Sequence, residues 1–113
     1  MSDDILKATR VNLLADFYQS LLTKTQAEYL QLYYGDDYSL GEIAELHHVS
    51  RQAVYDNLKR TVTSLENYEE RLHLYRDFQV RGRLVTQLQQ IVQTKYAHDS
   101  ELTTIIQKLA QCE

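Results

Sequence analysis

Apolar residues recur along most of this chain every three or four positions, which is the spacing of one face of an α-helix. Runs that alternate apolar and polar residues, as half-buried strands do, are absent from the sequence. The pattern predicts helical segments at about residues 3–22, 26–34, 39–46, 51–78, 84–92 and 100–109. The expected fold class is therefore all-α, with five or six helices.

Residues that cap helix N-termini stand at the predicted helix starts. Glu42 follows Ser39 by three positions, which is the spacing of a capping box. Capping side chains are also expected at three other starts, from Thr23 or Thr25, Ser50, and Asp99 or Ser100. The predicted elements thus begin where local chemistry favours a helix start.

Length and composition suit a small helical domain. The chain has 113 residues, no proline and three glycines, so few residues interrupt a helix. We expect one all-α domain over residues 1–113, with a core at 22–63 and a C-terminal helical extension at 64–113. Cys112 has no second cysteine with which to form an internal disulfide.

The charge balance limits the function classes. The formal net charge is −4, which argues against general nucleic-acid binding, because such binding comes mostly from lysine and arginine. The N-terminal segment MSDDILKATR has no apolar run long enough for a signal peptide or a membrane span. A cytoplasmic protein without a membrane partner is expected.

The segment SLGEIAELHHVSRQAVYDNLKR, residues 39–60, has the spacing of a helix-turn-helix. A small residue allows two helices to cross closely, a valine fills the gap between them, and a serine caps the second helix. The usual turn glycine is replaced by histidine, at a position that often needs positive φ. The turn and helix-crossing core is predicted to consist of Ile43, Ala44, His48, Val49, Val54 and Leu58.

If the second helix of this corner reads DNA, its outward face carries the contacts. Arg51 and Gln52 would meet base edges or phosphate near the helix start, with Tyr55 at the edge of the face. Lys59 and Arg60 would hold the DNA backbone. The predicted nucleic-acid-binding residues are Ser50, Arg51, Gln52, Tyr55, Asp56, Lys59 and Arg60.

Asp56 also supports another interpretation. It could accept a hydrogen bond from cytosine or repel phosphate. Residues 39–60 hold three acids and three bases, which is a weak electrostatic footprint for a DNA-binding module. The corner could therefore serve packing or protein binding.

Residues 22–60 resemble region 4 of bacterial sigma factors in LTKTQ, EIAE and VS. The segments YYGDDYSLGEIAE and VSRQAVYDNLKR resemble more closely the YlxM family of small helix-turn-helix proteins, over about residues 17–80. The resemblance implies a helix-turn-helix regulatory protein with a possible part in the signal recognition particle pathway. The alternative is an adaptor that contacts a protein or RNA component of that pathway without binding DNA.

No pattern indicates catalysis, a cofactor or a metal. His47 and His48 have no cysteine pair beside them, glycine-rich phosphate loops are lacking, and no nucleophile motif is present. An enzyme is the weakest function class, and no cofactor is expected.

Two features leave the choice of partner open. Tyr29, Tyr33, Tyr34 and Tyr38 either line the core or form an aromatic patch for a protein or RNA. A heptad-like seam from Leu58 to Tyr75 either packs on the terminal helices of the same chain or forms a homodimer.

Overall fold

The computed structural model describes residues 2–112, and these residues form six α-helices and no strand, as the sequence predicted. The chain divides into two compact units, Met1–His73 and Leu74–Glu113. The first unit contains four α-helices: α1 (Ser2–Tyr18), α2 (Lys24–Leu30), α3 (Leu40–His47) and α4 (Arg51–Leu72). The second unit contains α5 (Leu74–Lys95) and α6 (Ser100–Gln111).

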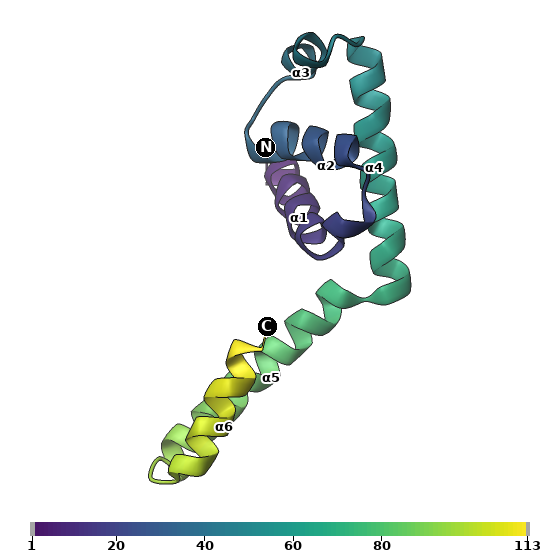
Figure 1. Cartoon of the computed structure of the whole chain (residues 1–113). Helices are drawn as coiled ribbons and strands as arrows, with labels where there is room; N and C mark the ends of the chain where they lie inside the picture. Colours follow the sequence, from purple (N-terminus) through teal and green to yellow (C-terminus); the bar gives the residue numbers. More distant parts are fainter. Residues whose placement is uncertain (1, 113) are drawn as a thin grey trace. The chain divides into compact units, whose positions relative to one another are not determined.

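Helix α4 is the central element of the first unit, and α1, α2 and α3 all pack against it (Figure 1). Its buried side chains recur at helical spacing, so α4 presents one apolar face to the other three helices. The apolar core of this unit consists of Val11, Leu14, Tyr18, Tyr29, Leu30, Ile43, Ala44, Val54, Leu58 and Leu65.

Two polar contacts join α1 to α4. The Tyr18 hydroxyl donates a hydrogen bond to Glu69 Oε1 at 2.7 Å, and both side chains are buried. Near the surface, Arg10 donates to both carboxylate oxygens of Glu66, each at 2.7 Å. Because a bidentate pair fixes both distance and orientation, these contacts set the position of α1 along α4.

The expected N-caps are present. Thr23 with Gln26 and Ser39 with Glu42 both form complete capping boxes. The hydrogen bonds from Ser39 lower the pKa of Glu42 from its usual value, because they stabilise the carboxylate form. The structure therefore confirms the predicted cap at Ser39 and selects Thr23 over Thr25 at the start of α2.

The second predicted helix is shorter than expected. Helix α2 ends at Leu30 and continues as a π-helical turn, Gln31–Gly35. Asn12 on α1 donates to the backbone oxygen of Tyr34 at 3.0 Å and thereby binds this turn to α1. The following loop reverses at Asp37, whose φ is 61°.

The prediction of one helix from residue 51 to about residue 78 is wrong. Helix α4 ends at Leu72, and α5 begins at Leu74. His73 between them has φ 56° and ψ 29°, a left-handed conformation that ends a right-handed helix. The break at His73 divides the predicted seam into two parts, because Leu58 lies in the first unit and Tyr75 lies in the second.

The N-terminal part of the predicted seam packs inside the first unit. Leu58, Thr61 and Leu65 are buried, and α4 contacts α1 and α2 on this side. Thr61 also donates to the backbone oxygen of Asn57, so its hydroxyl is satisfied. These three residues are consequently not available to a second copy of the chain.

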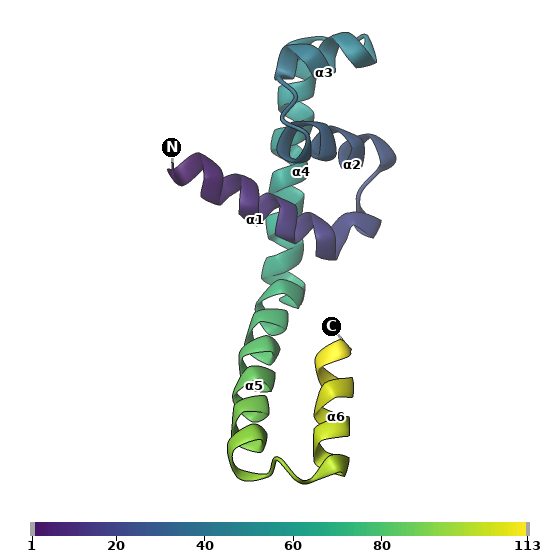
Figure 2. The same ribbon diagram turned by 90° about the vertical axis from the view of Figure 1, so that its left-hand side faces the viewer.

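The second unit is a helical hairpin, and Figure 2 shows α6 running back alongside α5. Asp99 caps α6 by accepting a hydrogen bond from the Leu102 backbone N–H at 2.9 Å. Val92 on α5 and Ile106 on α6 are its buried apolar residues among those that the structure describes.

Candidate nucleic-acid interface

The corner between α3 and α4 brings together the predicted crossing residues. Ile43 and Val54 are fully buried, and Ala44 and Leu58 are each 5% exposed. The small Ala44 side chain allows α3 to approach α4 closely, as a helix-turn-helix requires. Ile43, Ala44, Val54 and Leu58 therefore form a buried apolar core on both sides of the turn.

His48 supplies the reversal between the two helices. Its φ is 57° and its ψ is 42°, the left-handed conformation that is expected of the turn position. The backbone N–H of Val49 then donates to the Ala44 oxygen at 3.0 Å and closes the end of α3. Histidine thus occupies a conformation that glycine adopts at lower cost.

Val49 differs from the expectation. It was predicted to fill the gap between the two helices, but its side chain is 41% exposed. The buried contact at the corner comes instead from the residues of α3 and α4 themselves.

The N-terminus of α4 is well defined. The Ser50 hydroxyl oxygen accepts a hydrogen bond from the Ala53 backbone N–H at 3.0 Å. The Arg51 side chain is exposed and extends toward the start of α3, since a Cβ at Gly41 would lie 3.8 Å from Arg51 Nε. A cationic side chain therefore stands beside two helix N-termini, where the helix dipoles favour an anion.

The outward face of α4 is only partly free. Gln52 is exposed, but its amide nitrogen donates to Asp56 Oδ1 at 2.9 Å. Asp56 itself is half-buried. The carboxylate therefore orients the Gln52 amide along the helix and occupies one of the two N–H donors of that amide.

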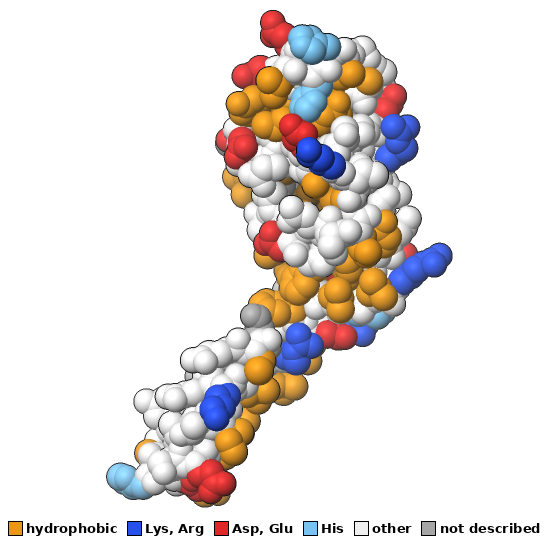
Figure 3. All heavy atoms as spheres, in the orientation of Figure 1, with side chains coloured by type: hydrophobic (Ala, Val, Ile, Leu, Met, Phe, Trp, Pro, Cys, Tyr) orange, Lys and Arg blue, Asp and Glu red, His pale blue; other side chains and the backbone are white. Residues whose placement is uncertain are grey.

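The remaining predicted contact residues are accessible. Tyr55 is 47% exposed, and Lys59 and Arg60 are exposed. On the face drawn in Figure 3, acidic and basic side chains are scattered over the first unit instead of forming one basic patch.

A hollow of about 320 Å³ next to Tyr55 and Lys59 was not anticipated from the sequence. Tyr33 and Tyr34 line it from the π-helical turn, and Lys7 lines it from α1. Burial and the neighbouring Tyr33 raise the pKa of Tyr34, which favours its neutral, hydrogen-bonding form. No local signal connects Lys7 to this place, because only the fold brings α1 to it.

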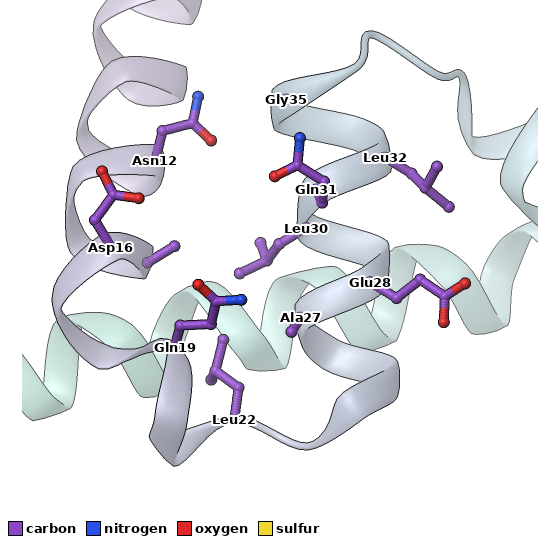
Figure 4. A pocket seen from close by; sticks show the side chains of 11 residues that line it. Asn12, Asp16, Gln19, Leu22, Ala27, Glu28, Leu30, Gln31, Leu32 and Gly35 are labelled. Atoms are coloured by element: carbon purple, nitrogen blue, oxygen red, sulfur yellow. The ribbon is translucent and has the colours of Figure 1, made fainter.

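A second hollow, of about 480 Å³, lies between α1 and α2 (Figure 4). Asn12, Asp16 and Gln19 line it from the α1 side, and Glu28 and Gln31 from the α2 side. Gln31 donates to Asp36 Oδ1 at 3.1 Å, so part of this polar lining is satisfied internally.

The histidines of the corner have different surroundings. His47 contacts the edge of the Tyr29 ring at a centroid distance of 4.8 Å. Its Nε2 lies 3.5 Å from Glu28 Oε1 but makes no hydrogen bond. Within residues 2–112, no cluster of three histidine, cysteine or acidic side chains is arranged to hold a metal ion.

None of the described helices has the length and apolar character needed to cross a bilayer.

A short helix, a left-handed turn and a serine-capped second helix over a shared apolar core define the class of helix-turn-helix proteins. Residues 5–108 match the family model described as "Putative helix-turn-helix protein, YlxM / p13 like". The chain belongs to this family, named UPF0122.

Individual relatives agree with this assignment. A UPF0122 protein of Limosilactobacillus reuteri is 56% identical over 110 residues, which cover 97% of each chain. One from Anoxybacillus flavithermus is 53% identical over 107 residues, which cover 95% of this chain and 97% of the relative. One from Lactiplantibacillus plantarum is 51% identical over 110 residues, which cover 97% and 96%.

Proposed function

We propose that this protein is a cytoplasmic regulatory protein that binds duplex DNA with the N-terminal half of α4 in the major groove. The observation that carries the proposal is the helix-turn-helix corner itself, which presents exposed cationic side chains on a helix fixed by a buried core. Arg51 would contact guanine or a phosphate, and Gln52 would contact adenine. Lys59 and Arg60 would bind the DNA backbone, and Tyr55 would contact the edge of the groove.

The sequence resemblance of residues 22–60 to sigma factor region 4 supports the use of the capped second helix as the reading element. Ser50 leaves its hydroxyl hydrogen free to donate to a phosphate, because its oxygen is the atom that caps α4. Asp56 would then restrict binding to sequences that offer a donor, such as cytosine N4.

Replacing Arg51 and Lys59 together by alanine tests the proposal. We expect the affinity for a mixture of duplex DNA at low salt to fall about 10- to 100-fold, since a good bidentate contact contributes about 1–3 kcal/mol. Fluorescence anisotropy with labelled duplexes measures the change.

A matched control removes the same charge elsewhere. Lys24 at the start of α2 and Arg71 near the end of α4 are both exposed. The control variant Lys24→Ala with Arg71→Ala should retain the affinity of the parent within a few-fold. Equal affinity of the parent and the Arg51→Ala, Lys59→Ala variant would exclude groove reading by α4.

A second candidate function is that of an adaptor for a protein or RNA component of the signal recognition particle pathway. The hollow that combines Tyr33, Tyr34 and Tyr55 with Lys7 and Lys59 supports it, because aromatic rings stack on unpaired bases while lysines bind phosphate. Parallel titration with the RNA of the particle separates the two functions. Loss of RNA binding in Tyr33→Ala, with duplex binding retained, would favour the adaptor.

A further inference from the structure

We propose that the outer apolar face of the α5–α6 hairpin binds a second copy of the same chain, with the two α5 helices antiparallel. This face consists of Val80, Leu84, Leu88 and Ile91 on α5 and Ile105 and Leu109 on α6. This apolar face is distinct from the predicted seam between Leu58 and Tyr75, because the N-terminal part of that seam is buried within the first unit. The proposal does not depend on DNA binding.

The hairpin leaves much of its apolar surface uncovered. Leu84 is 58% exposed, Ile91 is 47% exposed and Ile105 is 56% exposed. Val92 and Ile106 instead face the inside of the hairpin, where both are buried. A unit of about 40 residues rarely supplies a sufficient core by itself and is commonly completed by oligomerisation.

The exposed residues form one continuous face. At about 3.6 residues per turn, the four apolar residues of α5 fall on one side of that helix, adjacent to the side that carries Val92. On α6, Ile105 and Leu109 likewise lie on the side of the helix adjacent to the side that carries the buried Ile106. Because α6 runs antiparallel to α5, both outer stripes lie on the same side of the hairpin.

The dimensions of this face suit self-association. Helix α5 has 22 residues and α6 has 12, so they extend about 33 Å and about 18 Å. If the axes of α5 and α6 lie about 8–10 Å apart, as in packed helices, the outer apolar face of the hairpin covers on the order of 500 Å² per copy. Two copies would bury on the order of 1,000 Å², the lower bound for a specific interface.

Charge complementarity identifies a second copy as the occupant. Asp77 and Lys95 lie at opposite ends of the same side of α5 as the apolar stripe. Asp77 Oδ1 also lies 3.4 Å from Nε of the neighbouring Arg76, and both of these side chains are exposed. Along the sequence, Leu84 and Leu88 each lie two residues from Thr86, and Asp77 and Lys95 each lie nine residues from it. Antiparallel α5 helices centred on Thr86 would therefore place Leu84 opposite Leu88 of the second copy, and Asp77 opposite its Lys95, on both sides of the two-fold axis.

The oligomeric state of the full chain tests this inference. Sedimentation equilibrium should give the parent twice the monomer mass of 13.3 kDa at micromolar to tens-of-micromolar concentration. Reducing agent is kept throughout, because Cys112 is exposed and free to cross-link two chains. The variant Leu84→Glu with Leu88→Glu should sediment as a monomer.

The matched control places the same two charges on the other side of α5. The variant Thr86→Glu with Gln90→Glu should remain dimeric, since both residues are exposed and lie outside the apolar face. Circular dichroism of both variants and the parent compares their helix content, and equal content shows that the substitutions leave the helices folded.

Exchanging the charges of Asp77 and Lys95 tests the antiparallel register of α5, even if the Leu84→Glu, Leu88→Glu variant unfolds. Asp77→Lys and Lys95→Asp should each weaken the dimer at least about tenfold, because like charges then face each other. The double exchange should restore the parent affinity. A monomeric parent, a dimeric Leu84→Glu, Leu88→Glu variant, or a double exchange that fails to restore association would overturn the proposal.

Discussion

At the scale of single residues, the corner depends on a histidine that occupies a glycine-like conformation. His48 has positive φ and is exposed, so its side chain contributes no burial to offset the strain. Histidine tolerates this region better than β-branched residues do, but glycine adopts it without a steric cost. The sequence indicated this residue because the turn position was recognisable from its distance to Ala44.

Replacing His48 by glycine should therefore stabilise the protein. We expect the free energy of unfolding to rise by up to about 1 kcal/mol, which is the cost of left-handed backbone for a residue with a Cβ. Urea denaturation followed by circular dichroism measures it.

The control for this prediction is Glu45→Gly in α3, which is exposed and helical. It should lower the free energy of unfolding by about 1 kcal/mol, because glycine is unfavourable within a helix. A destabilising His48→Gly would show that the histidine side chain makes a favourable contact.

At the scale of elements, α4 organises the first unit through contacts on one face. Its buried positions include the acidic residue Glu69, which is 7% exposed. The structure places this carboxylate next to the Tyr18 hydroxyl. Burial of a charged group requires such a partner, so the α1–α4 contact is polar as well as apolar.

Removing the Tyr18 hydroxyl should weaken this contact. Tyr18→Phe keeps the ring but removes one donor from the buried Glu69, and we expect a loss of about 1–3 kcal/mol in the free energy of unfolding. Urea denaturation again provides the measurement.

Tyr55→Phe is the matched control, because Tyr55 is 47% exposed. Its effect should stay within about 0.5 kcal/mol. If the two variants were equally stable, Glu69 would have to be stabilised mainly by other partners.

At the scale of the whole molecule, the net charge of −4 leaves few cations to bind DNA, and the cations at the interface determine how binding depends on salt. The proposed interface offers three cations, Arg51, Lys59 and Arg60. Each phosphate that they neutralise contributes about 0.9 to the slope of log affinity against log salt. We therefore expect a slope of about −2 to −3, which anisotropy titrations at several salt concentrations measure.

A much steeper slope would contradict this prediction, because it would require more phosphate contacts than the α4 face provides. The matched control is the Lys24→Ala, Arg71→Ala variant, whose slope should equal that of the parent. Arg51→Ala should reduce the slope by about one unit if Arg51 contacts a phosphate, and leave it unchanged if Arg51 contacts a base.

The predictable part of the fold and site follows from local chemistry. Helical periodicity located the elements, the capping box at Ser39 located one helix start, and a second start was narrowed to Thr23 or Thr25. Ala44, His48 and Ser50 indicated the corner because their spacing is short and each has one physical role there. These features need only residues within a few turns of one another.

The less predictable part depends on contacts between distant residues. Nothing local distinguishes His73 from other helix residues, so the end of α4 was placed too late in the chain. Lys7 lines the hollow beside Lys59 only because α1 packs against α4.

By itself the sequence determined the helical class, the capped starts and the helix-turn-helix corner, because periodicity, capping and turn chemistry act over a few residues. The tertiary structure decided the left-handed break at His73, the burial of Glu69 beside Tyr18, and the residues that surround the hollow at Tyr55. These outcomes depend on which faces pack together, and the free energy of packing is shared among residues far apart in the chain.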